Sequence, residues 1–463
     1  MKSNNKIAHQ WRRLALVCLT TTFVAACSSS DDEKEVFEGD RISVLSYDSQ
    51  LRVDPRLSSQ PVNLLPPFKN SQWSNPGGFP THVAYHLALT GLNEAYRVEM
   101  VEGNNADRRL KSPPVIAGGK VFALGTDLNV VAVDAQTGAN IWTQSVAATY
   151  REPNTSLTRY FGFKDKPADV DDGFGGGVAY EDGRVFVTTG FGEILALSAE
   201  SGDIIWRVQN TVPFSNAPTI RKGMLYVVSR DSRLQVLSTA DGSRAWEFLA
   251  ITEQASILAS SSPAVSDQMV VAGFNSGEVS ALSTINGSTI WNDSLSSRAT
   301  QVTPLSELNT IIGRPVIDRD RVYVTSHGGR TAAIDIRNGE RIWTSDIGSI
   351  ETPWVIGDFV LVMSLDGDLV CLSREQGRVR WVASLGAYED PDEREERIRW
   401  AGPVLGEGRI LAASSDGRLA SVNPANGEIN EMIELDEAVS VAPVIANGTL
   451  YILTDEGSLI ALR

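Results

Sequence analysis

The sequence predicts an all-β fold, a single eight-bladed β-propeller with four antiparallel strands in each blade. The first observation is a repeated frame in which two glycines stand ten residues apart and a tryptophan follows four residues later. The full frame occurs at Gly192/Gly202/Trp206, Gly277/Gly287/Trp291, Gly329/Gly339/Trp343 and Gly367/Gly377/Trp381. The second observation is a proline fourteen residues before the first frame position in seven copies. These prolines are Pro114, Pro218, Pro263, Pro315, Pro353, Pro403 and Pro443. The spacing between the prolines of consecutive copies, which is the length of one repeat, is typical of propeller repeats.

The third observation is the pattern inside one copy. After Pro353, apolar runs at residues 354–356, 359–364, 369–373 and 379–382 are each of strand length and are separated by turn residues. The turn Asp366-Gly367 suits a tight hairpin, because both residue types tolerate positive φ. Four short antiparallel strands repeated at this spacing predict one propeller blade. The tryptophan lies on the outer strand, where its large ring is expected to pack between neighbouring blades.

The less regular copies predict how the ring closes. Leu128 and Ser232 replace the first glycine in two copies, and Glu431 replaces the tryptophan in the seventh. The eighth copy starts at Gly457 and lacks an outer strand before the sequence ends. Residues 92–99 can serve as that strand, with Tyr96 in the role of the tryptophan. We therefore expect an N-terminal strand to complete the last blade, which removes the exposed sheet edge.

The first residues predict export and lipidation. Residues 1–26 carry four basic residues, no acidic residue and an apolar stretch, which is typical of a signal peptide. The stretch ends in small residues before Cys27, followed by serines, and this resembles a bacterial lipobox in which the cysteine is diacylated. Ser28 at the next position, in place of aspartate, indicates the outer membrane by resemblance to Gram-negative lipoprotein sorting. Ordinary cleavage after Ala26 is the alternative.

The composition indicates that the mature chain has an N-terminal tether and a propeller, and it argues against nucleic acid as a partner. Residues 27–80 are expected to form an acylated, flexible acidic tether and an irregular segment, and residues 81–463 the propeller. Removing residues 1–26 changes the net charge from −16 to −20, which argues against nucleic acid as a partner. Cys371 is the one cysteine of the propeller and is expected to be a small core residue.

No catalytic or metal-binding motif stands out. The sequence contains no Gly-x-Ser-x-Gly elbow, phosphate loop or cluster of metal ligands. His82 and His86 have the i, i+4 spacing of a helical metal pair, but their surroundings predict a loop and two ligands do not make a zinc site. We expect a protein without enzymatic activity and without a cofactor.

The repeat resembles two known families. Residues 132–142, Ala-Val-Asp-Ala-Gln-Thr-Gly-x-x-x-Trp, look like the repeat of propellers that bind pyrroloquinoline quinone. The quinoprotein dehydrogenases share it but use a vicinal cysteine pair that this chain lacks. The BamB family of outer-membrane assembly lipoproteins combines such repeats with a lipobox, and the resemblance covers nearly the whole chain. Residues 313–318, 326–330 and 400–404 look like those of alphaproteobacterial members.

The resemblance to the BamB family implies a non-catalytic scaffold. Such a protein is anchored in the outer membrane through Cys27, faces the periplasm, binds the periplasmic domains of BamA and assists the insertion of β-barrel proteins, whose unfolded chains are further candidate partners. Two inter-blade loops carry the family's partner surface. Their positions fall on Ala255, Ser256, Ile257, Leu258, Thr310, Ile311 and Ile312. The family's charged residues are absent at these positions, so we expect a more apolar contact, with burial of these side chains under their own loops as the alternative.

Two other functions remain open from the sequence. A periplasmic quinoprotein oxidoreductase would hold a cofactor on the propeller axis. The second is a propeller that binds envelope polysaccharide or peptide on its axial face.

Overall fold

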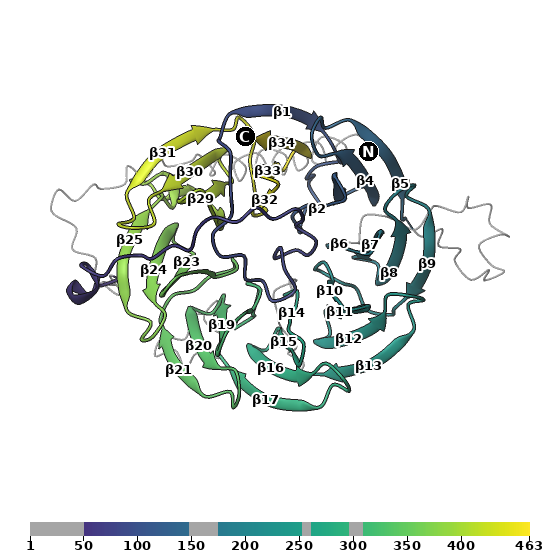
Figure 1. The fold of residues 1–463 in the computed structure, drawn as a ribbon, viewed down its shortest axis with the longest axis horizontal. Coiled ribbons are helices and arrows are strands. Elements are labelled where there is room, and N and C mark those ends of the chain that lie inside the picture. The colour runs from purple at the N-terminus through teal and green to yellow at the C-terminus, as the bar shows by residue number, and fades with distance from the viewer. Residues whose placement is uncertain (1–50, 148–174, 252–260, 296–308) are drawn as a thin grey trace, which may run out of the picture. The chain divides into compact units, whose positions relative to one another are not determined.

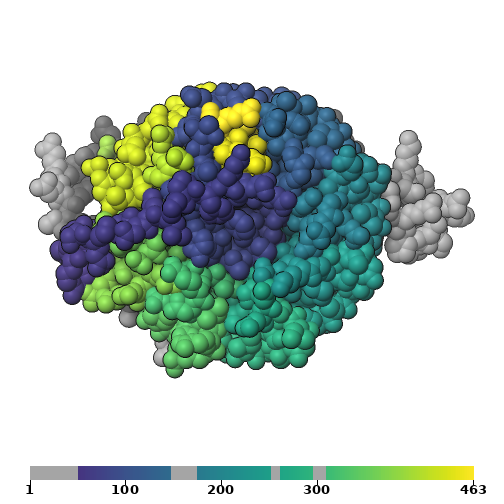
Figure 2. Space-filling model, viewed as in Figure 1, coloured from purple at the N-terminus to yellow at the C-terminus, as the bar shows by residue number. Residues whose placement is uncertain are grey.

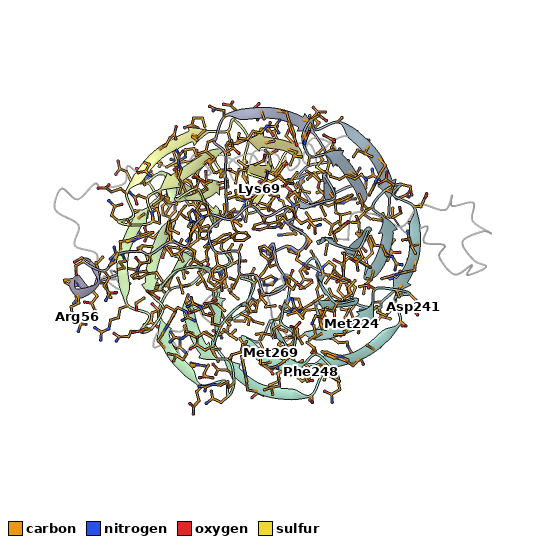
Figure 3. All side chains as sticks on the ribbon, in the orientation of Figure 1. Arg56, Lys69, Met224, Asp241, Phe248 and Met269 are labelled. Carbon is orange, nitrogen blue, oxygen red and sulfur yellow. The ribbon has the colours of Figure 1, made fainter. Side chains whose placement is uncertain are left out.

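The computed structural model describes residues 51–147, 175–251, 261–295 and 309–463. Within these ranges, eight four-stranded antiparallel sheets surround a central axis, and the first strand of each blade lies innermost (Figure 1). The predicted eight-bladed propeller is therefore confirmed. Side chains occupy the space between the blades and around the axis (Figure 3). No helix among the residues of these ranges is long and apolar enough to cross a membrane.

The first four blades follow one another along the chain. Their strands are β2 (Val115–Ala117), β3 (Lys120–Leu124), β4 (Asn129–Asp134) and β5 (Asn140–Ser145); β6 (Gly176–Glu181), β7 (Arg184–Thr189), β8 (Glu193–Ser198) and β9 (Ile204–Gln209); β10 (Thr219–Arg221), β11 (Met224–Val228), β12 (Arg233–Ser238) and β13 (Arg244–Leu249); and β14 (Ala264–Val265), β15 (Met269–Gly273), β16 (Glu278–Ser283) and β17 (Thr289–Ser294).

The remaining blades complete the ring, and a small hairpin and a short 3₁₀ helix (η1) lie outside the sheets. The strands of blades five to eight are β18 (Val316–Asp318), β19 (Arg321–Ser326), β20 (Arg330–Asp335) and β21 (Arg341–Ser345); β22 (Trp354–Ile356), β23 (Phe359–Met363), β24 (Asp368–Ser373) and β25 (Val379–Ser384); β28 (Trp400–Gly406), β29 (Arg409–Ser414), β30 (Arg418–Val422) and β31 (Ile429–Glu434); and β32 (Val444–Ala446), β33 (Thr449–Leu453), β34 (Ser458–Leu462) and β1 (Glu94–Glu99). The additional elements are the hairpin β26 (Tyr388–Asp390) and β27 (Glu395–Arg397), and η1 (Pro55–Leu57).

The two ends of the propeller chain share the last blade, as the sequence predicts. Strand β1 pairs antiparallel with β34, from Glu94 opposite Leu462 to Glu99 opposite Ser458. The hydroxyl of Tyr96 donates to the carbonyl oxygen of Ala135 in the first blade at 3.1 Å. Hydrogen bonding between distant parts of the chain thus holds the ring closed and gives the last blade its fourth, outermost strand.

The repeated tryptophan and the second glycine of the frame meet across six of the eight blade boundaries. A Cβ added to Gly287 would lie 2.5 Å from the ring of Trp246 in the preceding blade, so only glycine lets the ring approach this closely. The indole nitrogen of Trp246 also donates to the carbonyl oxygen of Thr284 at 3.2 Å. The same pair of contacts recurs for Trp142, Trp206, Trp291, Trp343 and Trp381. The frame therefore encodes the interface between blades.

The exceptions to the frame also have structural explanations. Glu431 stands at the tryptophan position of the seventh blade. In the eighth blade, which follows it, the chain makes no turn into the outer strand, because β1 supplies that strand from the other end of the chain. No frame glycine is available there for a ring to cover, and Glu431 is exposed. Leu128 and Ser232 keep the positive φ of the glycines that they replace, 62° and 61°. This conformation is unfavourable for residues with a side chain.

The segment before β1 makes a circuit of the ring and covers one end of the axis. It runs from η1, at the rim beside β25, toward the centre (Figure 2), and the labelled Arg56 and Lys69 mark this stretch (Figure 3). Between residues 70 and 90 it then forms hydrogen bonds with the eighth blade, with blades one to seven in order, and again with the eighth. The residues that it bonds are Asn447, Ile116, Tyr180, Ile220, Val265, Ile317, Trp354, Leu405 and Gly448.

Candidate functional site

The two ends of the axis differ in what covers them. The N-terminal segment bonds mainly to the last residues of the innermost strands or to the turns that follow them. The connections that lead from one blade to the next enter the innermost strands at their other ends. We call this second end the entry face. The two loops that the sequence predicts to bind a partner are connections of this kind.

The structure describes three of the seven predicted partner-binding residues. Residues 255–258 lie outside the described residues. Thr310 and Ile311 are buried, and the amide of Ile311 donates to the carbonyl oxygen of Phe274 at 3.2 Å. The Ile311 side chain packs on Gly273, where an added Cβ would come within 2.3 Å of it. The alternative of burial under the loop thus applies to Thr310 and Ile311, and in this conformation Ile312 is the half-buried side chain that a partner can reach.

Ile312 lines a cavity of about 230 Å³ at the entry face of the axis. The cavity is formed by residues that precede or begin the innermost strands of several blades, among them Asn216, Ile350 and Trp400. Its walls include apolar side chains, and its other lining groups include arginine, lysine, serine, asparagine and one carboxyl group, that of Glu351. The sequence does not reveal this cavity, because its residues are far apart in the chain and only the closed ring brings them together.

Two buried ionisable side chains of the cavity wall, Glu351 and Arg314, lie near His82 of the N-terminal segment. Burial raises the pKa of Glu351 to about 7, although its Oε2 accepts a hydrogen bond from the amide of Gly402 at 3.2 Å. Burial also lowers the pKa of Arg314, which donates to Thr352 Oγ1 at 3.2 Å. His82 has a pKa lowered to about 3 by burial and by Arg314, so its ring is neutral at ordinary pH. Its Nδ1 lies 2.7 Å from the carbonyl oxygen of Pro315.

The two histidines of the N-terminal segment have structural contacts and do not form a metal pair. Nδ1 of His86 lies 2.6 Å from the carbonyl oxygen of Leu65, and its Nε2 accepts from the amide of Gly408 at 2.8 Å. Neither histidine is in a helix, and His82 has a φ of 63°. Among the described residues there is no cluster of three or more side chains that could hold a metal ion.

Cys371 is fully buried in the sheet of the sixth blade. Burial raises the pKa of its thiol, which keeps the reactive thiolate form from populating. It behaves as the small core residue that the sequence predicts.

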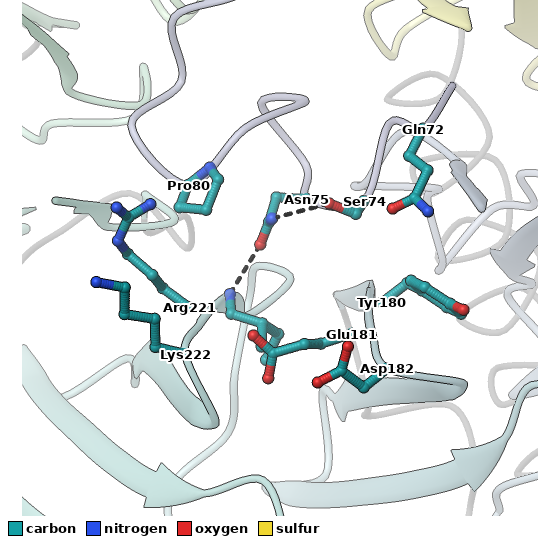
Figure 4. A pocket seen from close by; sticks show the side chains of 10 residues that line it. Gln72, Ser74, Asn75, Pro80, Tyr180, Glu181, Asp182, Arg221 and Lys222 are labelled. Carbon is teal, nitrogen blue, oxygen red and sulfur yellow. Dashed lines mark hydrogen bonds between the residues drawn. The ribbon is translucent and has the colours of Figure 1, made fainter. Parts of the chain in front are cut away.

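A larger cavity, of about 350 Å³, lies at the opposite end between the N-terminal segment and blades two and three (Figure 4). Asn75 spans part of it, because its Oδ1 accepts from the amide of Ile220 at 2.7 Å. Several of the charged groups in its wall are already engaged. Glu181 accepts from the amide of Gly223 at 3.0 Å, and Arg221 is paired with Asp267 at 2.6 Å. These bonds join the segment and the blades and give the cavity a structural explanation.

Comparison with known proteins identifies the family. The family model described as outer membrane protein assembly factor BamB matches residues 94–157 and 127–383. The outer membrane protein assembly factor BamB of Yersinia pestis is 26% identical over 349 residues, which are 75% of this chain and 83% of the relative. The crystal structure of BamB from Moraxella catarrhalis superimposes with a TM-score of 0.65 at 19% identity, over 80% of this chain and 99% of that one.

The other family that shares the repeat is represented by a structural neighbour. Quinohemoprotein alcohol dehydrogenase from Comamonas testosteroni superimposes with a TM-score of 0.59 at 13% identity, over 87% of this chain and 78% of that one. At this identity the likeness shows the shared propeller fold alone. Sequence similarity over most of the chain assigns it instead to the assembly factors, which are not enzymes. The chain belongs to the BamB family of outer membrane protein assembly factors.

Proposed function

We propose that this protein is a scaffold of the outer-membrane β-barrel assembly machine, anchored through acylated Cys27 and facing the periplasm. In this role it binds the periplasmic domains of BamA and assists the insertion of β-barrel proteins into the outer membrane. Membership of the BamB family supports the proposal, together with the lipobox at the start of the sequence.

The proposal assigns partner binding to the entry face of the ring. The single observation that carries this assignment is the position of Ile312, which is half-buried beside the axial cavity while its neighbour Ile311 is buried in the blade. The N-terminal segment covers the opposite end of the axis, so the entry face is the end on which a partner meets the inter-blade connections directly. Ile257 and Leu258, which lie outside the described residues, are proposed to take part in the same contact.

The test is recovery of BamA with purified variants of the full-length, C-terminally tagged protein. Ile312→Asp places a charge in the proposed apolar contact, and we expect BamA binding to fall by roughly tenfold or more, as when a central interface residue is lost. Ile285→Asp is the matched control, because Ile285 is 88% exposed on the turn between β16 and β17. Circular dichroism must show that both variants are folded. Equal recovery of BamA with both variants would remove the entry face from the proposal.

A further inference from the structure

A group of positive charges surrounds the entry-face cavity of this acidic protein. Arg109, Lys111 and Arg399 line the cavity, and their side chains form no ion pair among the residues that the structure describes. Elsewhere in the described ring, many arginines are paired with a carboxylate, for example Arg97 with Glu437 at 2.8 Å. A chain with a net charge of −16 thus keeps three cations, none of them ion-paired with a described residue, together at one end of its axis.

The surroundings of Lys111 show that these cations act on one another. Burial lowers the pKa of Lys111, and the guanidinium groups of Arg399, Arg109 and Arg230 lower it further. The nearby carboxylate of Asp455 acts in the opposite direction, but both of its oxygens already accept hydrogen bonds from Ser440, at 3.0 and 2.7 Å. Mutual repulsion of this kind is relieved when an anion binds between the positive groups.

An unused amide lies in the wall of the same cavity. Asn216 is 6% exposed, and neither its side-chain nitrogen nor its side-chain oxygen has a hydrogen-bond partner among the described residues. A buried amide without partners is costly, and such groups are rare in native proteins. Because the amide offers both a donor and an acceptor, a peptide group, which has the same two functions, would satisfy it.

The size and the apolar walls of the cavity restrict the ligand further. Its volume of about 230 Å³ is below the roughly 300–1,000 Å³ of sites that enclose drug-sized molecules. It therefore suits the end or the turn of a chain. Ile312, Ile350 and Trp400 provide apolar contact beside the charged groups, which a peptide uses and a small inorganic ion does not.

We propose that the entry-face cavity is a binding site for an acidic peptide segment. In this site Arg109, Lys111 and Arg399 contact carboxylate groups at the mouth, and the Asn216 amide bonds a peptide group of the ligand. The carboxylate can come from acidic side chains or from the end of a peptide chain. The inference goes beyond the function proposed above, because binding of a peptide to the purified protein does not require BamA.

Fluorescence anisotropy of labelled hexapeptides with the full-length protein in detergent tests the site. One probe contains three consecutive acidic residues and has blocked ends, the second has neutral side chains and a free terminal carboxylate, and the third is neutral with blocked ends. We expect an acidic probe to bind, the neutral blocked probe not to bind, and the affinity to fall as the salt concentration rises. The acidic probe that binds identifies the source of the carboxylate.

Variants locate the binding at the cavity. Lys111→Gln combined with Arg399→Gln is expected to weaken binding roughly tenfold, because two charge-assisted contacts are lost. Both residues are exposed to solvent overall, although the surrounding protein lowers the pKa of the Lys111 amine, so the protein should remain folded. Lys222→Gln, which removes one exposed positive charge at the opposite end, should leave the affinity unchanged. Asn216→Asp, which is nearly isosteric, should weaken binding by placing a negative charge in the wall.

Several results would overturn the proposal. They are failure of both acidic probes to bind, equal binding of the neutral blocked probe, and unchanged affinity in the double variant. A loss of affinity that is as large for Lys222→Gln as for the double variant would also overturn it, because binding would then follow total charge and not the cavity.

Discussion

Replacing Trp73 with alanine tests whether the N-terminal segment is part of the folded ring. Trp73 is 3% exposed and stacks on Trp354 with ring centroids 6.4 Å apart. A tryptophan buries about 150–250 Å². At about 25 cal/mol per Å², the loss is about 4–6 kcal/mol, near the upper part of the range measured for such substitutions. The indole nitrogen has no partner among the described residues, so the expected loss comes from apolar contact.

Urea unfolding followed by circular dichroism measures this loss without relying on tryptophan fluorescence. Leu65→Ala is the control on the same segment, because Leu65 is 57% exposed and its replacement should change the free energy of unfolding by less than about 0.5 kcal/mol. We expect Trp73→Ala to lower the free energy of unfolding by about 4 kcal/mol. A change below about 1 kcal/mol, or one equal to that of Leu65→Ala, would refute the packing of this segment against the blades.

Three further predictions concern the repeat and the axis. Ser232→Gly should raise the free energy of unfolding by about 1 kcal/mol, because glycine adopts the φ of 61° without strain; thermal unfolding measures it, and a loss of stability would contradict the explanation. Gly287→Ala should destabilise the protein by at least about 1–3 kcal/mol, because its Cβ would lie 2.5 Å from the ring of Trp246; an unchanged unfolding midpoint in urea would show that the blades do not approach as described. Burial raises the pKa of Glu351 to about 7, so the folded protein holds a proton that the unfolded chain releases near pH 4.5. This group therefore makes stability fall as pH rises from about 4.5 to 7, and Glu351→Gln should remove that contribution. The difference in melting temperature between the wild type and this variant, followed across that window, should change with pH, and a constant difference would contradict the shift.

The fold could be predicted closely because its interfaces are local patterns repeated along the chain. The frame glycines and tryptophans mark contacts that the structure confirms, such as Trp246 on Gly287. Even the exception at Glu431 follows from closure of the ring by β1. The path of residues 70–90 around the ring could not be predicted from the sequence. This segment is irregular, and its hydrogen bonds go to strands that are distant in the sequence.

The candidate site was less predictable for a physical reason. Family resemblance led to Ile311 and Ile312 together, but adjacent residues of an extended segment point in opposite directions. The side chain of Ile311 packs on Gly273, whereas Ile312 faces the cavity. The basic cluster of Arg109, Lys111 and Arg399 depends on ring closure, which brings residues near 110 and 400 to one cavity. The sequence alone does not reveal this cluster, because its residues are far apart in the chain.

Photo-crosslinking at position 312 tests the central claim most directly. A photoreactive amino acid is placed at Ile312, and in a matched protein at Ile285, in cells that assemble outer-membrane β-barrels with this protein. The account predicts a crosslinked product that contains BamA from position 312 and none from position 285. A product with BamA from position 285 alone, or no product with BamA from position 312 in a folded and acylated protein, would contradict binding through the entry face.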